Sequence, residues 1–514
     1  MSPRTLRRGL LAATAALALA VPVVLAPSAL ADPAKHSSEK LQKAVTLDGV
    51  KRHLRVFQAI ADHNDGIRAS GTSGFEVSAD YVAGVMRAAG HQVTVQEFEF
   101  PFFNELSDPV LEQVSPDATT YPPQQDFATM TYSGAGDVTA TVEGVDLALA
   151  DPASSTSGCE AADFTGFTSG NIALVQRGAC TFAAKTENAQ AAGATGVIVF
   201  NQGNDPGRMD AFAGTLGGPV ASVPVVGASF ALGQDLADPA GTVAHLATDT
   251  VSETRTTSNV IAETREGRDD NVVMLGAHLD SVTEGPGIND NGSGSAAILE
   301  TAWQMRKMDP ENTVRFAWWG AEELGLLGSE HYVSQLSQSE RDRIALYLNF
   351  DMVASPNFAR FVFDGDDSDG VGAGPGPEGS AAIEQLFVDH FDGNGLPSEG
   401  TDFDGRSDYG PFIAVGLPAG GLFTGAEVAK TGAQAATYGG QAGIAFDPCY
   451  HQACDTIDNI NNKALNTNAD AIAHAAATYA FDTSDVNGVA SLGASQGAGE
   501  LAPRTAGHVG DLAR

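Results

Sequence analysis

Regular alternation of apolar runs with amphipathic segments is the feature that most restricts how this 514-residue chain can fold. From Asn259 to about Tyr479, short runs rich in Val, Leu and Phe alternate with segments of helical spacing. Strands are expected at Val272–Gly276, Thr313–Trp319, Ala345–Phe350 and Phe361–Phe363, and a helix at Ser295–Met305. This alternation predicts an α/β sheet covered by helices.

Two further stretches, residues 48–100 and 101–257, precede this alternation. Residues 48–61 and 76–89 have the apolar spacing of helices, and residues 91–100 alternate as a strand does. They open an α/β domain but are too short to complete one. Residues 101–257 differ, with short strands, many turns and one βαβ-like unit at residues 170–200. After Asp482 the chain is rich in Gly, Ala and Ser, which predicts a disordered tail.

The N-terminus carries the only long apolar run. Arg4, Arg7 and Arg8 precede Leu10–Leu25, and Ala29-Leu30-Ala31 is typical of a cleavage site. We therefore predict a secretory signal peptide cleaved after Ala31, with the Tat and Sec routes both open. No second run of this kind follows, so the mature, secreted chain is expected to have no membrane span.

Charge excludes one large class of partners. Lys and Arg number 28 against 64 Asp and Glu, a formal net charge of −36, and nucleic-acid binders need the opposite balance. Four cysteines in an exported chain permit two disulfides, with three possible pairings. The simplest pairing is local, joining Cys159 to Cys180 and Cys449 to Cys454.

Five short motifs at strand ends or in loops carry the residues that can do chemistry. They hold His278 and Asp280, then Asp290, then Glu322 and Glu323, then Asp351, and finally His451. Each motif alone is weak, but together they offer two imidazoles, several carboxylates and one spare Glu. Imidazole with carboxylate suits zinc, and two ions that share a carboxylate can activate a water for attack on a carbonyl. An unliganded Glu would move that water's proton.

These motifs resemble those of the secreted bacterial di-zinc (leucyl) aminopeptidases of metallopeptidase clan MH, streptomycete type. The resemblance covers about residues 48–100 and 259–479 and implies a zinc-peptidase fold with a central mixed β-sheet flanked by helices. It implies that His278 and Asp351 bind one zinc, that Glu323 and His451 bind the other, and that Asp290 bridges both. Glu322 would be the general base and then the general acid, and Asp280 would orient His278 from behind.

The resemblance also suggests roles for three residues near the substrate. Tyr450 matches a tyrosine that hydrogen-bonds the oxyanion, Arg406 matches an arginine near the substrate, and Phe423 matches part of an apolar specificity pocket. The alternatives are a packed aromatic, a structural ion pair and a core side chain, respectively. We do not expect the calcium site of some relatives, because Ala44 and Asn466 replace two of its aspartates and only Asp470 is kept.

Residues 170–201, with Arg177-Gly178 and Cys180-Thr181-Phe182, resemble a protease-associated (PA) domain, which would be β-rich with some helix and inserted in the peptidase domain. It would act as a substrate-contacting lid or be a passive insert. The expected boundaries are 1–31 signal peptide, 32–105 N-terminal part of the peptidase domain, 106–256 PA domain, 257–482 catalytic domain and 483–514 disordered tail.

The expected function is that of a monomeric, secreted metallo-aminopeptidase that removes an N-terminal Leu or other large apolar residue from peptides with a free N-terminus. A carboxypeptidase-like relative would need basic residues to hold a terminal carboxylate, and few lie in the motifs beyond Arg406. A glutaminyl-cyclase-like relative would work with one zinc. A binding protein on an inactive scaffold fits poorly, because all five ligands and the general base are present.

Overall fold

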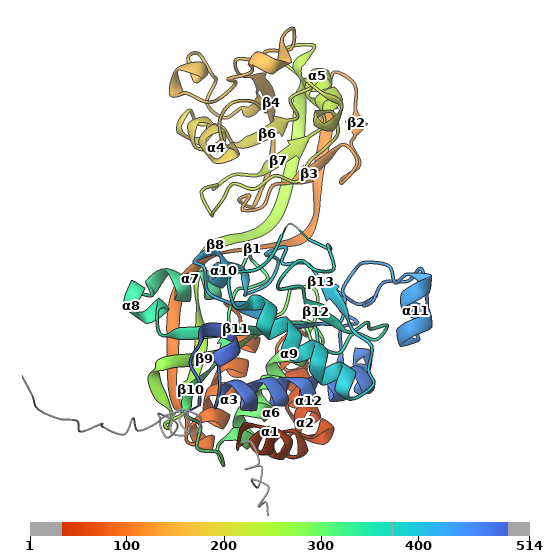
Figure 1. The fold of residues 1–514 in the computed structure, drawn as a ribbon. Helices are drawn as coiled ribbons and strands as arrows, with labels where there is room; N and C mark the ends of the chain where they lie inside the picture. The colour runs from red at the N-terminus through yellow and green to blue at the C-terminus, as the bar shows by residue number, and fades with distance from the viewer. Residues whose placement is uncertain (1–32, 373, 492–514) are drawn as a thin grey trace, which may run out of the picture.

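Two lobes joined by a pair of long antiparallel strands make up the chain (Figure 1). The structure is a computed structural model that describes residues 33–372 and 374–491, so the predicted signal peptide lies outside the described residues. Strands β1 (Gln92–Ser115) and β8 (Val243–Glu263) pair from Gln92↔Glu263 to Ser115↔Val243. We call residues 33–104 and 251–491 the large lobe, and residues 105–250 the small lobe.

A mixed β-sheet forms the centre of the large lobe, as predicted. Its strand order is β13-β12-β14-β11-β9-β10-β8, with β1 at the edge beyond β8. Strands β14, β11, β9 and β10 run parallel, whereas β8 and β12 are antiparallel to their neighbours β10 and β14. The strands not yet located are β9 (Arg268–His278), β10 (Asn312–Trp319), β11 (Ile344–Phe350), β12 (Phe361–Phe363), β13 (Glu399–Thr401) and β14 (Ala419–Phe423).

Helices cover both faces of this sheet. One face packs against α3 (Ser73–Ala89), α6 (Gly292–Met305), α9 (Ser380–Gly393) and α12 (Asn462–Tyr479), and α1 (Pro33–Ala44) and α2 (Leu47–Asp62) pack on the outer side of α6 and α12. The other face packs against α7 (Leu327–Gln335) and α10 (Gly410–Ala414). Two further helices, α8 (Gln338–Arg341) and α11 (Gly432–Tyr438), lie in connecting segments. Within residues 33–491, no helix combines the length and hydropathy that crossing a membrane requires.

In the small lobe the sheet continues from β8, which pairs with β4, and then follows the order β4-β5-β6-β7-β3. It contains the predicted βαβ unit, made of β5 (Ile172–Gln176), α4 (Phe182–Ala191) and β6 (Gly196–Phe200). The remaining elements are β2 (Thr119–Thr120), β3 (Phe127–Thr129), β4 (Gly136–Gly144), β7 (Val225–Ala228) and α5 (Phe230–Ala237). The Cys159–Cys180 disulfide closes the loop before α4, and Cys449–Cys454 is also formed, so the local pairing is confirmed.

Strand β1 is longer than predicted, because it continues from residue 100 to Ser115. Pro101 and Pro109 lie within β1, whose main neighbour is β8, and an edge strand tolerates proline on its unpaired side. As a result the predicted domain boundaries at 105/106 and 256/257 fall inside two continuous strands rather than in linkers.

The disordered tail was predicted to begin at residue 483, which is too early in the chain. Residues 483–491 are folded, with α13 (Ser484–Asn487) and a bridge between Thr483 and Val489. Thr483 is fully buried and its hydroxyl accepts a hydrogen bond from Asn271 at 2.9 Å, while Val486 is also buried. These tertiary contacts hold a segment whose composition alone indicates disorder. The rest of the predicted tail, residues 492–514, lies outside the described residues.

Candidate metal centre

The predicted site residues meet at one edge of the large-lobe sheet. His278 is the last residue of β9, Glu322 and Glu323 follow the end of β10, and Asp351 follows β11. Since these strands are parallel neighbours, their carboxyl ends lie together, which is where ligands bind in open α/β sheets.

Asp290 reaches the same edge through the start of α6. Asn291 caps this helix by accepting a hydrogen bond from Gly294 N, and its amide donates to the Phe350 carbonyl at 2.8 Å. Gly294 lies so close to the same carbonyl that a Cβ there would clash with it. Helix α6 therefore docks directly on the end of β11 and brings Asp290 to Asp351.

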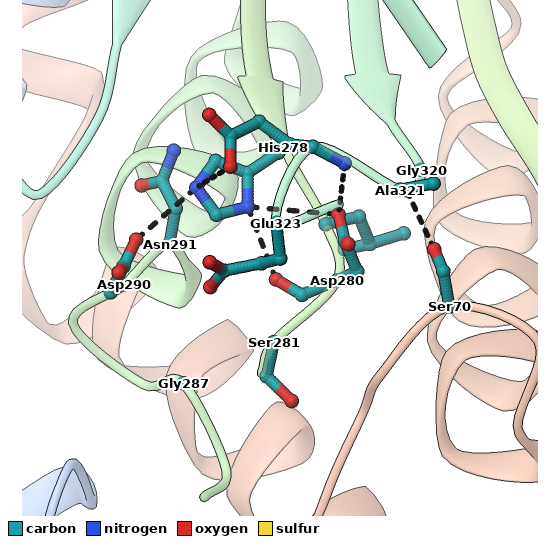
Figure 2. Close-up of polar contacts among 12 residues, drawn as sticks. Ser70, His278, Asp280, Ser281, Gly287, Asp290, Asn291, Gly320, Ala321 and Glu323 are labelled. Carbon is teal, nitrogen blue, oxygen red and sulfur yellow. Dashed lines mark hydrogen bonds and ion pairs between the residues drawn. The ribbon is translucent and has the colours of Figure 1, made fainter. Parts of the chain in front are cut away.

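The side chains form two groups that share Asp290. In the first, His278 Nε2 lies 3.2 Å from Asp290 Oδ1 and 3.3 Å from Asp351 Oδ1. In the second, His451 Nε2 lies 3.2 Å from Asp290 Oδ2 and 3.0 Å from Glu323 Oε2. Figure 2 shows the His278 ring near Asp290, with Glu323 beside it. Each Asp290 oxygen thus faces a different histidine, and each histidine has a second carboxylate beside it.

The donor set fits zinc. Two ligand atoms at about 2.0–2.1 Å from a tetrahedral zinc lie roughly 3.3 Å apart, close to the four separations above. Asp351 Oδ1 and Glu323 Oε1 are buried and have no hydrogen-bond partner in the described residues. Buried carboxylate oxygens without partners are costly, and a cation relieves that cost. These residues therefore suit ions in both groups.

The two histidines sit in a strongly negative field. Burial lowers the pKa of His278, but the charge of Glu322 and the neighbouring carboxylates raise it well above its usual value. Burial likewise lowers the pKa of His451, yet hydrogen bonds with Asp290 and Glu323 raise it to about 10. Without an ion these imidazoles would hold protons, and a metal that binds them must displace those protons.

The carboxylates divide according to their surroundings. Burial acts to raise the pKa of Asp290, but hydrogen bonds from His278 and His451 bring it below its usual range. Burial and the charge of Asp290 raise the pKa of Glu323 to about 8. Burial raises the pKa of Glu322 well above its usual value. An excess of buried carboxylates over basic groups favours added positive charge here.

Glu322 is the carboxylate least engaged with the histidines. Its Oε2 is 3.8 Å from His278 Nε2, the longest of that ring's contacts with carboxylates on its Nε2 side. The distances between side chains would also allow Glu322 to bind a metal ion together with His278 and Asp351. Asp280 lies behind His278: its main-chain oxygen is 3.1 Å from Nδ1 and its carboxylate 3.7 Å away. That carboxylate also accepts a hydrogen bond from Glu322 N at 3.3 Å, so it contacts both residues.

A cavity of about 480 Å³, the main cavity, opens beside this centre and is lined by all three residues expected near the substrate. Tyr450 stacks on His451 with ring centroids 3.8 Å apart, and burial raises its pKa above the usual value. Phe423 ends β14 and stacks on Phe361. Arg406 forms an ion pair with Glu427 at 3.0 Å, which is the alternative role considered for this residue.

Arg68 is a supporting residue that the sequence did not single out. It is fully buried and donates to the carbonyls of residues 279, 286 and 287 at 2.5, 2.9 and 2.6 Å. These carbonyls belong to the loop between His278 and Asp290. Arg68 therefore fixes the spacing of two centre residues, although it lies about 210 residues earlier in the chain.

Two buried aspartates support the other side of Asp290. Asp455 accepts hydrogen bonds from Asn289 N and Asp290 N at 2.9 and 3.0 Å. Asp447 accepts one from the Asn289 amide at 2.7 Å, and Asn459 donates to both aspartates. Both aspartates flank the Cys449–Cys454 loop that holds His451, and this nearness to a site histidine is the only sequence signal for them.

The chain is similar to known peptidases over most of its length. The profile of Peptidase family M28 matches residues 259–476, and that of the PA domain matches residues 142–236. An "Aminopeptidase" of Pseudomonas aeruginosa is 49% identical over 449 residues, covering 87% of this chain and 83% of its own. "Leucine aminopeptidase 2" of Arthroderma otae is 41% identical, covering 89% of each chain.

Two solved structures share the fold. The aminopeptidase from Aneurinibacillus sp. strain AM-1 has a TM-score of 0.59 and 27% identity, covering 85% of this chain and 95% of its own. A zinc aminopeptidase from Bacillus subtilis has a TM-score of 0.52 and 26% identity, covering 86% and 93%.

Proposed function

This chain belongs to peptidase family M28 and is a zinc aminopeptidase with an inserted PA domain, and we propose on that basis that it is exported and uses two zinc ions to release large apolar N-terminal residues. His278, Asp290 and Asp351 would hold one ion, and His451, Glu323 and Asp290 the other. One observation carries the count of two: the oxygens of Asp290 face different histidines at 3.2 Å each.

The chemistry divides between the ions and the side chains. When bound, two zinc ions polarise the scissile carbonyl and lower the pKa of a water. Glu322, which is buried and lines the main cavity, would take the proton from that water and deliver it to the leaving amine. The Tyr450 hydroxyl would donate a hydrogen bond to the oxygen that becomes negative.

The main cavity supports selection of an apolar first residue. Met352, Phe363 and Phe423 line it, and burial of an apolar side chain against them favours Leu over Ala or Gly. Carboxylates also line it, among them Asp351 and Asp404, and they would attract the free ammonium of the substrate. Arg406 also lines this cavity and would approach the substrate as well.

Export and domain organisation complete the proposal. The predicted signal peptide ends at Ala31, and two disulfides suit an oxidising compartment. We assign the peptidase domain to residues 32–105 and 257–491, which includes the folded segment 483–491, and the PA domain to residues 106–256.

The decisive experiment combines activity with metal analysis. Glu322→Gln should keep two zinc ions per chain while kcat for leucine p-nitroanilide falls by about 10²–10⁴. Glu323→Gln, its matched neighbour, should lose zinc as well as activity. Loss of zinc from Glu322→Gln would exclude the proton-transfer role, and one zinc per wild-type chain would exclude the two-ion site. If an N-acetylated substrate were cleaved as fast as the same substrate with a free amine, selection for a free amine would be contradicted.

A further inference from the structure

A second cavity of about 430 Å³, which we call the rear cavity, lies on the other side of the metal centre. It lies between β1, the loop at residues 280–284 and the turn after β10. Among the described residues that line each cavity, the rear and main cavities share Glu323 and His451 alone. Figure 2 shows Ser70 and Ser281, which line the rear cavity, on the side of Glu323 away from Asp290.

This position has a direct consequence for a bound peptide. The scissile bond must lie at the metal centre, so the residue before it and the residue after it extend away in different directions. The main cavity suits the first residue, because its apolar wall includes Met352 and Phe423. We propose that the rear cavity binds the residue that follows the scissile bond, and that it prefers an aromatic or large apolar side chain there. This inference rests on the proposed function and adds a second specificity site to it.

The wall of the rear cavity supports an apolar ligand. Phe102 and Phe103 of β1 line it together with Val282 and Leu324. Phe102 is held rigidly, because the Arg255 guanidinium lies 3.6 Å from its ring centroid and its own exposure is 4%. Four apolar side chains from three sides of the cavity can remove most of an aromatic ring from water.

The small lobe takes part in this wall. Phe103 packs against Tyr132 of the small lobe with ring centroids 5.9 Å apart, in an edge-on arrangement. The Ser252 hydroxyl of β8 donates to the Tyr132 carbonyl at 3.1 Å. The position of Phe103 is therefore set from the small lobe, which links the inserted domain to selection of the second residue.

Charge adds a second selection. The lining residues of the rear cavity in the described chain include no Lys or Arg, and their acidic residue away from the metal centre is Glu284. Glu284 is exposed at the edge, where the carboxylate of a bound dipeptide would lie near it. Repulsion should disfavour dipeptides with a free C-terminus relative to their amides or to longer peptides.

The test compares second residues while the first is fixed as Leu. With the zinc-loaded full chain, kcat/KM for Leu-Phe-amide should exceed that for Leu-Gly-amide by about tenfold, the factor that about 1.4 kcal/mol supplies. Phe103→Ser and Val282→Asn should each reduce this ratio at least about threefold, while Phe103→Leu should keep most of it. Leu106→Ala is the matched control, since Leu106 lies on the same strand but is 55% exposed and outside the cavity.

Two results would overturn the assignment. One is a Phe-to-Gly ratio that neither Phe103→Ser nor Val282→Asn changes. The other is a change in the ratio of Leu-Gly-amide to Ala-Gly-amide instead, which would make the rear cavity the site for the first residue. Failure of the wild type to cleave leucinamide would contradict the proposed function itself and is read separately.

The charge step has its own readout. Leu-Phe-amide should be cleaved at least about fivefold faster than Leu-Phe with a free carboxylate, and Glu284→Lys should reduce that difference about threefold or more. Equal cleavage of the acid and the amide by the wild type would refute this part.

Discussion

Replacement of Arg68 by Met tests whether the metal centre depends on a residue that never touches a ligand. The Arg68 guanidinium donates to three carbonyls of the loop at residues 279–287, and its carbon lies 5.1 Å from the Phe57 ring centroid. Burial lowers its pKa to about 10, so it stays charged at neutral pH. Met has a similar length and apolar stem but offers no donor.

The expected cost follows from the groups left behind. Each buried carbonyl that loses its donor costs about 1–3 kcal/mol, and the three lie within one loop, so their costs overlap. We expect about 3–5 kcal/mol of lost unfolding free energy, or roughly 5 °C in Tm for a unit the size of the large lobe. Because the same loop spaces His278 from Asp290, zinc affinity should fall about 10–100-fold.

Two measurements test this reasoning, namely thermal unfolding with excess zinc and zinc affinity by chelator competition. Arg87→Met is the control, because Arg87 is exposed on α3 and should change neither quantity. Arg68→Lys should recover part of the stability, since an ammonium keeps the charge but lacks the planar set of donors. If Arg68→Met unfolds within 1 °C of the wild type and binds zinc equally well, the proposed support of the loop is wrong.

Three further predictions concern metal, acid and disulfides. Chelation should abolish activity and lower Tm, because the buried carboxylates of the site are left without cations, and added zinc should restore both. An unchanged Tm after verified zinc removal would contradict this. Burial and the charge of His474 lower the pKa of His390 to about 4, so between pH 6.5 and 4 the unfolded chain binds more protons and the unfolding free energy falls with falling pH. This loss should reach about 1–2 kcal/mol at pH 5 for a partly exposed ring, and His390→Leu should remove it from the pH dependence of Tm. Cys159→Ser/Cys180→Ser should cost about 3 kcal/mol and Cys449→Ser/Cys454→Ser about 2 kcal/mol, since the first pair closes the longer loop; calorimetry giving the reverse order would count against the loop-entropy argument.

The strands and helices that position the site could be predicted because their signals are local. Apolar runs end at His278, Trp319 and Phe350, and parallel pairing then places the residues after them at one sheet edge. The length of β1 could not be predicted in this way. Proline argues against a strand unless the strand lies at an edge, and edge position depends on partners far along the chain.

Supporting residues were missed for the same reason. Arg68 follows α2 in a short loop, and nothing nearby indicates that it will be buried against residues 279–287. Asp455 looks like any acidic residue in a chain with 64 of them, yet it binds two main-chain amides beside Asp290. Sequence spacing identifies groups that share a strand end, but not groups that meet only through tertiary packing.

The paired strands β1 and β8 also indicate where an extra domain can enter such a fold without disturbing it. Asn104 and Val251 face each other across the ladder, so the ends of the small lobe lie one strand spacing apart. A short turn between these residues would leave an ordinary β-hairpin at the margin of the large-lobe sheet. The tip of a hairpin is a position where insertion breaks no core contact, and acquisition of the small lobe there amounts to lengthening two strands already in register.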